Sequence, residues 1–123
     1  MIDVEEAAQT LKQRREKRRI ALQKRLEAAE RDAERIICYI AEKYSPIRIH
    51  QWGSLVHTER FSEISDIDIA LEGLTNQEAL SVLRNKAESM TDFALDIVTM
   101  EHLDAGRANL IRRFGRMVWE KKS

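Results

Sequence analysis

Apolar residues recur at steps of three and four along the first third of the chain, which is the period of an α-helix. The stripe consists of Val4, Ala8, Leu11, Leu22, Leu26, Ala29, Ala33, Ile36 or Ile37, Ile40 and Tyr44. No Gly or Pro precedes Pro46, so the pattern predicts a helix from residue 3 to about 45. Arg15 and Arg18 occupy positions of the stripe at which the helical period would place apolar residues. The pattern therefore leaves open whether the predicted helix is one rod or two segments.

A single helix of that length would be about 60 Å long, because each helical residue adds about 1.5 Å. A globule of 123 residues has a radius of gyration of only about 14 Å. One end of the helix must therefore protrude or pack on a partner. We expect residues 28–44 to pack on the core and residues 1–25 to protrude, and we divide the chain into a basic helix at 1–34 and a domain at 35–123.

After Pro46 the hydrophobic period changes from that of a helix to the alternation of a strand. Alternating segments predict strands over residues 47–52, 66–71 and 93–98. A capping box at Thr75–Glu78 predicts a helix to about residue 90, residues 100–113 read as helix interrupted near Gly106, and residues 116–120 as a short strand or helix end. Strands that alternate with helices predict an α/β (α+β) domain with a small mixed sheet flanked by helices.

The formal net charge is zero, with 21 basic and 21 acidic residues, but the charges are segregated along the chain. Residues 12–25 hold eight Lys and Arg against Glu16 alone, a net charge of +7. Residues 59–104 hold eleven carboxylates against three cations, a net charge of −8, and such a region attracts metal ions. The single cysteine, Cys38, has no partner within the chain, which favours a reducing cytoplasmic setting. Its place between Ile37 and Ile40 predicts that it is a small buried apolar residue. No apolar run approaches the 18 residues of a membrane span.

Three aspartates fall in or beside the predicted strands. Asp66 and Asp68 are two residues apart and therefore point to one face of a strand, while Ile67 and Ile69 point to the other. Asp96 lies in the next predicted strand, so the three carboxylates converge if the two strands are neighbours in register. Clustered carboxylate oxygens suit Mg²⁺ or Mn²⁺, whereas the alternative is a pair of edge-strand aspartates that face water.

The pair Gly53-Ser54 follows the first predicted strand. A glycine lets the backbone approach a phosphate closely, and a serine hydroxyl adds a donor. Such a turn is common and carries little weight alone. Beside three carboxylates it indicates phosphoryl or nucleotidyl transfer, in which metal ions neutralise a triphosphate and stabilise the departing pyrophosphate.

Three motifs together resemble the minimal nucleotidyltransferase (MNT) proteins of the DNA polymerase β-like superfamily. They are Trp52-Gly53-Ser54, Ser65-Asp66-Ile67-Asp68-Ile69 and Leu95-Asp96-Ile97-Val98. The resemblance implies a nucleotidyltransferase fold over residues 35–123, metal ions held by Asp66, Asp68 and Asp96, and triphosphate contacts from Gly53 and Ser54. Small members of this family commonly act as antitoxins that pair with a helical HEPN protein.

The resemblance therefore implies a Mg²⁺-dependent or Mn²⁺-dependent enzyme that moves AMP from ATP, or another nucleotide, to a partner protein. The stretch between Ser54 and Asp66 is eleven residues long and departs from the family pattern. This departure leaves open an inactive MNT-fold module that neutralises its partner by contact alone. A third possibility is an oligomerising or nucleic-acid-binding protein that works through its basic helix. Because the net charge is zero, nucleic acid is not the partner we expect, whereas self-association through that helix stays open.

Overall fold

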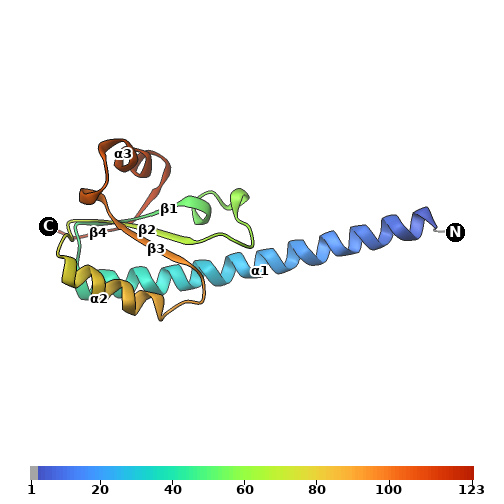
Figure 1. Ribbon diagram of the computed structural model, residues 1–123, viewed down its shortest axis with the longest axis horizontal. Coiled ribbons are helices and arrows are strands. Elements are labelled where there is room, and N and C mark those ends of the chain that lie inside the picture. Colours follow the sequence, from blue (N-terminus) through green and yellow to red (C-terminus); the bar gives the residue numbers. More distant parts are fainter. Residues whose placement is uncertain (1–2) are drawn as a thin grey trace.

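A four-stranded mixed sheet forms the centre of the protein in the computed structural model, which describes residues 3–123 (Figure 1). The strands are β1 (Arg48–Trp52), β2 (Ile67–Glu72), β3 (Leu95–Thr99) and β4 (Arg116–Glu120), and their order in the sheet is β3-β2-β1-β4. Strands β2 and β3 are parallel, whereas β1 is antiparallel to both β2 and β4. The predicted small mixed sheet is confirmed, and residues 116–120 form a strand.

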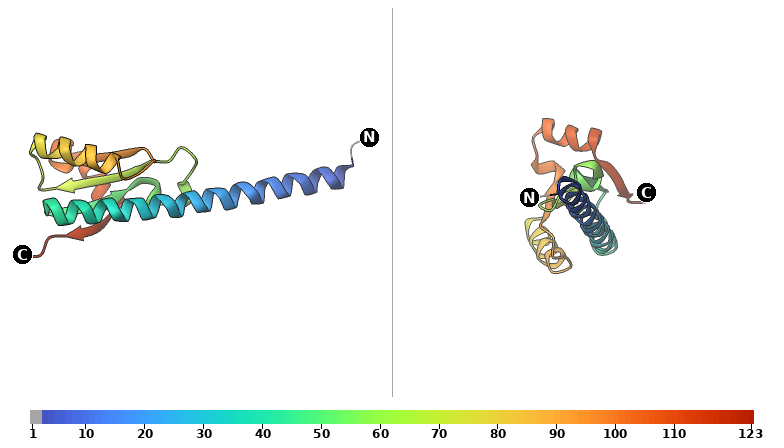
Figure 2. Two further views of the ribbon diagram at one scale, coloured as in Figure 1. Left: turned by 90° about the horizontal axis from the view of Figure 1, so that it is seen from below. Right: turned by 90° about the vertical axis from the view of Figure 1, so that its right-hand side faces the viewer.

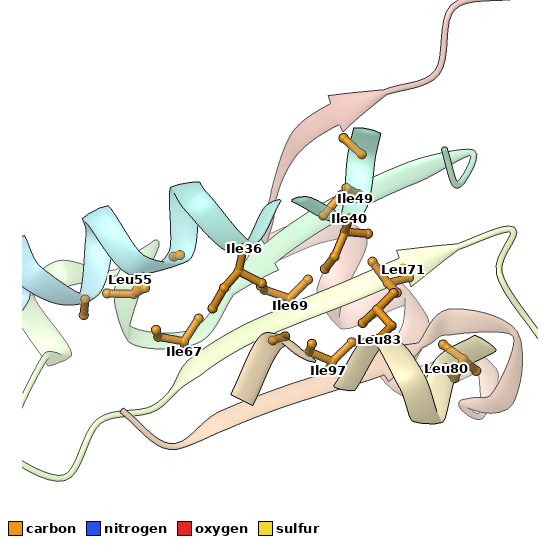
Figure 3. Close-up of a cluster of buried hydrophobic side chains, with 14 of the residues drawn as sticks. Ile36, Ile40, Ile49, Leu55, Ile67, Ile69, Leu71, Leu80, Leu83 and Ile97 are labelled. Carbon is orange, nitrogen blue, oxygen red and sulfur yellow. The ribbon is translucent and has the colours of Figure 1, made fainter. Parts of the chain in front are cut away.

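Helices cover both faces of this sheet. The helices α1 (Val4–Tyr44) and α2 (Gln77–Glu88) lie on one face, and α3 (Ala105–Phe114) lies on the other (Figure 1). Side chains of β2 point alternately to the two faces of the sheet. Ile67, Ile69 and Leu71 belong to the larger core cluster on the α1 and α2 side, whereas Ala70 packs with α3 on the other side. Figure 3 shows the larger cluster between α1, α2 and the sheet. Asp68 is two residues from Ala70 and therefore faces the α3 side.

Helix α1 is one continuous helix of 41 residues, so the rod is confirmed over the two-segment alternative. Asp3 caps its start by accepting a hydrogen bond from Glu5 N at 2.9 Å, and Ser45 ends it in the left-handed conformation before Pro46. Buried positions begin at Leu26 and recur at Ala29, Ala33, Ile36 and Ile40. The N-terminal half extends far past the sheet (Figure 2). The division of the chain at residues 34 and 35 stays a prediction.

The predicted interruption of the helical stretch near Gly106 is confirmed, because a short 3₁₀ helix ends at His102 and Asp104 caps α3 by accepting from Arg107 N. Two other local predictions were wrong. The N-cap of α2 is Asn76, whose side chain accepts from Ala79 N at 2.9 Å, and not Thr75 of the predicted capping box. The side chain of Cys38 is exposed.

A charged cluster ties the sheet to α3. Glu72, which is only 8% exposed, accepts hydrogen bonds from Arg48 Nη1 at 2.9 Å and from Arg112 Nε at 3.3 Å. Arg48 also donates to Glu120, so the cluster links β1, β2, β4 and α3. Burial opposes the charged form of Glu72, but these bonds together with the charge of His50 hold its pKa below the usual value.

None of the helices in the described part of the chain is both long and apolar enough to cross a membrane.

Candidate functional site

The predicted site residues gather at one end of the sheet. The carboxyl end of β1 meets the amino ends of β2 and β3 there, and the register pairs Trp52 with Asp68 and Asp68 with Asp96. Asp96, 28 positions further along the chain, is thus the direct parallel neighbour of Asp68. Asp66 lies one residue before β2. The two aspartate-bearing strands are therefore neighbours in register, which was the condition for their carboxylates to converge.

Gly53 brings the turn after β1 against the same carboxylate. Its φ is +75°, a left-handed conformation that favours glycine, and it begins a short 3₁₀ turn over Gly53–Leu55. A Cβ atom built at Gly53 would overlap Asp68 Oδ2 and would lie 3.2 Å from Asp68 Cγ. The absence of a side chain at Gly53 is therefore what allows the turn to lie on Asp68. Ser54 is the next residue of this turn.

The electrostatics of the site are those of concentrated negative charge. Burial raises the pKa of Asp68 to about 6, and repulsion from Asp96 and then from Asp66 adds to the shift. The ion pairs within residues 3–123 involve none of these three carboxylates. The donor set consists of oxygens with negative charge that no protein cation balances, which fits a hard divalent cation. As the side chains stand, no three His, Cys, Asp or Glu groups among the described residues lie close enough together to hold a metal ion.

A cavity of about 430 Å³ opens beside Gly53, between the turn and α3. Helix α3 lines it with Arg107, Leu110 and Phe114, and the segment after β1 lines it with residues that include Arg60. The indole Nε1 of Trp52, which also lines the cavity, is buried and has no hydrogen-bond partner in the described part of the structure. An apolar slot with cations at its rim suits the base and the phosphates of a nucleotide.

The sequence did not point to the α3 side of this cavity. Leu110 and Phe114 are both more than half exposed, and their spacing of four places them on one face of α3. The spacing of these two apolar residues was the signal available in the sequence. It indicates a cavity wall only when the turn after β1 is known to lie opposite α3, where His57 Nε2 and the Phe114 carbonyl oxygen are 2.9 Å apart.

Comparison with known proteins shows likeness in structure but not in sequence. No established family profile matches the chain, and no curated protein is similar to it in sequence. A chain from a mutant of the toxin–antitoxin pair MntA–HepT superimposes with a TM-score of 0.60 at 20% identity, over 73% of this chain and 74% of that chain. The chain has the MNT nucleotidyltransferase fold.

Two further structures bear out this MNT fold. A toxin–antitoxin structure with AMP-PNP has a chain with a TM-score of 0.60 and 22% identity, over 72% of this chain and 74% of that chain. The third is a tri-AMPylated HEPN toxin of Shewanella oneidensis in complex with an MNT antitoxin, with a TM-score of 0.58 and 20% identity, over 76% of this chain and 73% of that chain. The fold expected from the three motifs is confirmed.

Proposed function

We propose that this protein is a nucleotidyltransferase of the MNT antitoxin type that moves AMP from ATP to a hydroxyl group of a HEPN-type partner protein in the cytoplasm. The observation that carries the proposal is the arrangement of Asp68, which is the parallel neighbour of Asp96 and lies directly under the Gly53 turn. An acidic pair and a phosphate-accessible turn at one point of a sheet are what transfer from a nucleoside triphosphate requires.

In this proposal Asp66, Asp68 and Asp96 hold the Mg²⁺ or Mn²⁺ ions. Those ions would neutralise the triphosphate and stabilise the pyrophosphate that leaves. Gly53 lets the phosphates approach the backbone, and the hydroxyl of Ser54 donates to them. Asp96 is more exposed than Asp68 and accepts the proton of the attacking hydroxyl. The hydroxyl oxygen forms a bond to the α-phosphorus as the bond between that phosphorus and pyrophosphate breaks.

The cavity beside Gly53 supports a nucleotide as the donor. Leu110 and Phe114 offer an apolar surface to the base of the nucleotide. Arg60 and Arg107 are exposed cations at the rim, where phosphate oxygens would lie in this proposal.

The proposed acceptor rests on the structural neighbours. One of them is an MNT antitoxin in complex with a HEPN toxin that carries three AMP groups.

The test is intact-mass analysis of the protein and a HEPN protein encoded beside it, incubated with Mg²⁺ and ATP. We expect the partner to gain the mass of one or more AMP groups. Asp68→Asn should abolish the gain. The matched control is Glu88→Gln, because Glu88 is an exposed carboxylate that lies near Asp96 and has no ion pair among the described residues. No mass gain in the wild-type complex would contradict the proposed transfer.

The eleven-residue stretch between Ser54 and Asp66 favours a second candidate, a module that neutralises its partner by contact alone. The two functions differ in one result. If Asp66→Asn combined with Asp68→Asn leaves the complex intact but stops neutralisation, binding alone is insufficient and the transferase is supported. If neutralisation persists in that variant, the contact module is supported.

A further inference from the structure

The N-terminal half of α1 has no partner in the described structure. Every residue from Asp3 to Arg25 is exposed except Ala7 and Leu22, which are half-buried, and the first buried position is Leu26. At about 1.5 Å per residue, the stretch from residue 4 to residue 25 reaches about 30 Å beyond the core. Figures 1 and 2 show this arm leaving the domain as a straight helix.

The arm carries unbalanced positive charge. Its basic segment, residues 12–25, holds eight cations: Lys12, Arg14, Arg15, Lys17, Arg18, Arg19, Lys24 and Arg25. Within residues 3–123, only Arg19 has a carboxylate partner, Glu16 at 2.6 Å. Seven cations within about four turns of helix are thus available to an anion from outside the chain.

The cations of the basic segment are concentrated on the side of α1 that faces the sheet. The buried positions Leu26, Ala29, Ala33 and Ile36 define that side, and steps of three and four trace it back through Leu22 to Arg18, Arg15 and Leu11. At 100° per residue, Arg14, Arg19 and Arg25 flank this stripe. The side of the helix that is apolar under the sheet therefore becomes arginine-rich where the sheet ends.

The arginine-rich side begins at the same end of the sheet as the candidate site. The Arg25 guanidinium lies 4.6 Å from the ring centroid of Phe93, just before β3, and Leu22 and Arg25 share a surface hollow with Glu63, which precedes β2. The amino ends of β2 and β3, which carry Asp68 and Asp96, are therefore the part of the domain from which the basic segment departs.

We propose that residues 12–25 form a docking surface for nucleic acid, held through its phosphate backbone. Arginine offers planar, bidentate donors to phosphate, and a row of cations without carboxylate partners matches a polyanion. A helix of a protein partner would need a continuous apolar stripe, but Arg15 and Arg18 interrupt it between Leu11 and Leu22. A second copy of the segment would bring another charge of +7 against the first. The zero net charge of the whole chain conceals this local surface.

The test is fluorescence anisotropy of the full chain with a labelled single-stranded RNA of mixed sequence. The single-stranded DNA and the duplexes of that sequence serve as further probes. We expect binding that weakens steeply between about 50 and 200 mM salt. The combined variant Arg14→Gln, Arg15→Gln and Arg18→Gln should weaken binding about tenfold or more and reduce the salt slope by about 2, because each lost phosphate contact removes about 0.7. Glutamine is a good helix former, so helicity by circular dichroism should not change.

The matched control removes three cations elsewhere, by Lys86→Gln, Lys121→Gln and Lys122→Gln, and should change affinity less than twofold. The combined change of Arg14, Arg15 and Arg18 to Lys should keep most of the affinity, since the charge is retained. Three results would overturn the proposal: no binding at about 50 mM salt, equal weakening in the control, or a dimer in sedimentation that the arginine substitutions dissociate. None of these results depends on nucleotidyl transfer, so the proposed function stands or fails separately.

Discussion

Replacing Gly53 by alanine tests the contact that defines the candidate site. Two costs are expected, and the structure separates them. An L-residue at a φ of +75° costs about 1–2 kcal/mol, partly offset by about 0.5 kcal/mol because alanine restricts the unfolded chain. The added Cβ also overlaps Asp68 Oδ2, and turning that carboxylate out of its rotamer costs about 1 kcal/mol. The sum is a loss of about 2 kcal/mol in the free energy of unfolding.

The second cost can be removed without changing the first. The three nearest atoms to the added Cβ all belong to Asp68, and the Cβ of Asp68 lies at an acceptable 3.6 Å. In an Asp68→Ala background, Gly53→Ala should therefore cost only about 1 kcal/mol, which leaves a coupling of about 1 kcal/mol between the two positions.

Urea denaturation of the four proteins in this cycle measures the coupling. Gly106→Ala serves as the control, because Gly106 lies in α3 without a positive φ and far in sequence from Asp68. Its added Cβ would lie 3.3 Å from Asp104 Oδ1, which offsets the helix propensity gained with alanine, so stability should change by less than about 0.5 kcal/mol. If Gly53→Ala costs the same in both backgrounds, the Gly53 turn does not lie on Asp68 and the reasoning about the site is refuted.

Three further predictions concern stability. Asp68→Asn should stabilise the metal-free protein by about 2 kcal/mol at pH 7, because the pKa of Asp68 is raised to about 6 and folding therefore disfavours its charged form. Thermal unfolding in EDTA should show that this gain in stability vanishes near pH 4. A loss of stability at pH 7 would contradict the prediction. Glu72→Gln should cost about 2 kcal/mol in the free energy of unfolding at pH 7, because the pKa of Glu72 is lowered by folding. The contribution of the charge is fully present above the usual pKa of the group and is lost as the pH falls through the lowered pKa. Urea titrations should therefore show the cost shrink toward pH 3, and a constant cost would exclude the charge as its origin. Deleting residues 1–20 should change the free energy of unfolding by less than about 0.5 kcal/mol, because the described residues of that stretch bury almost no surface. A larger loss of stability in a denaturant titration would show that the arm folds cooperatively with the domain.

The strands and helices were predictable because their causes are local. The alternation of Ile67, Asp68 and Ile69 specifies which side chains share a face of β2 whatever its neighbours are. The steps of three and four likewise specify the buried stripe of α1 from Leu26 to Ile40. Helix boundaries were predicted less well. Asn76 and Asp104 are the N-cap residues because their side chains accept hydrogen bonds from free backbone N–H groups of the first helical turn. Several neighbouring residues could have made the same kind of bond, so the sequence did not specify which one caps the helix.

The sequence by itself determined the residue types of the candidate site and the faces on which they lie. Only the tertiary structure decided that Asp96 pairs with Asp68 and that the Gly53 turn rests on that carboxylate, because strand order and register depend on contacts between distant segments. The cavity against α3 arises in the same way, since Leu110 and Trp52 are brought together only by the packing of α3 on the sheet. The sequence also predicted that residues 1–25 protrude, whereas the residue at which burial of α1 begins, Leu26, depends on how far the sheet extends along the helix.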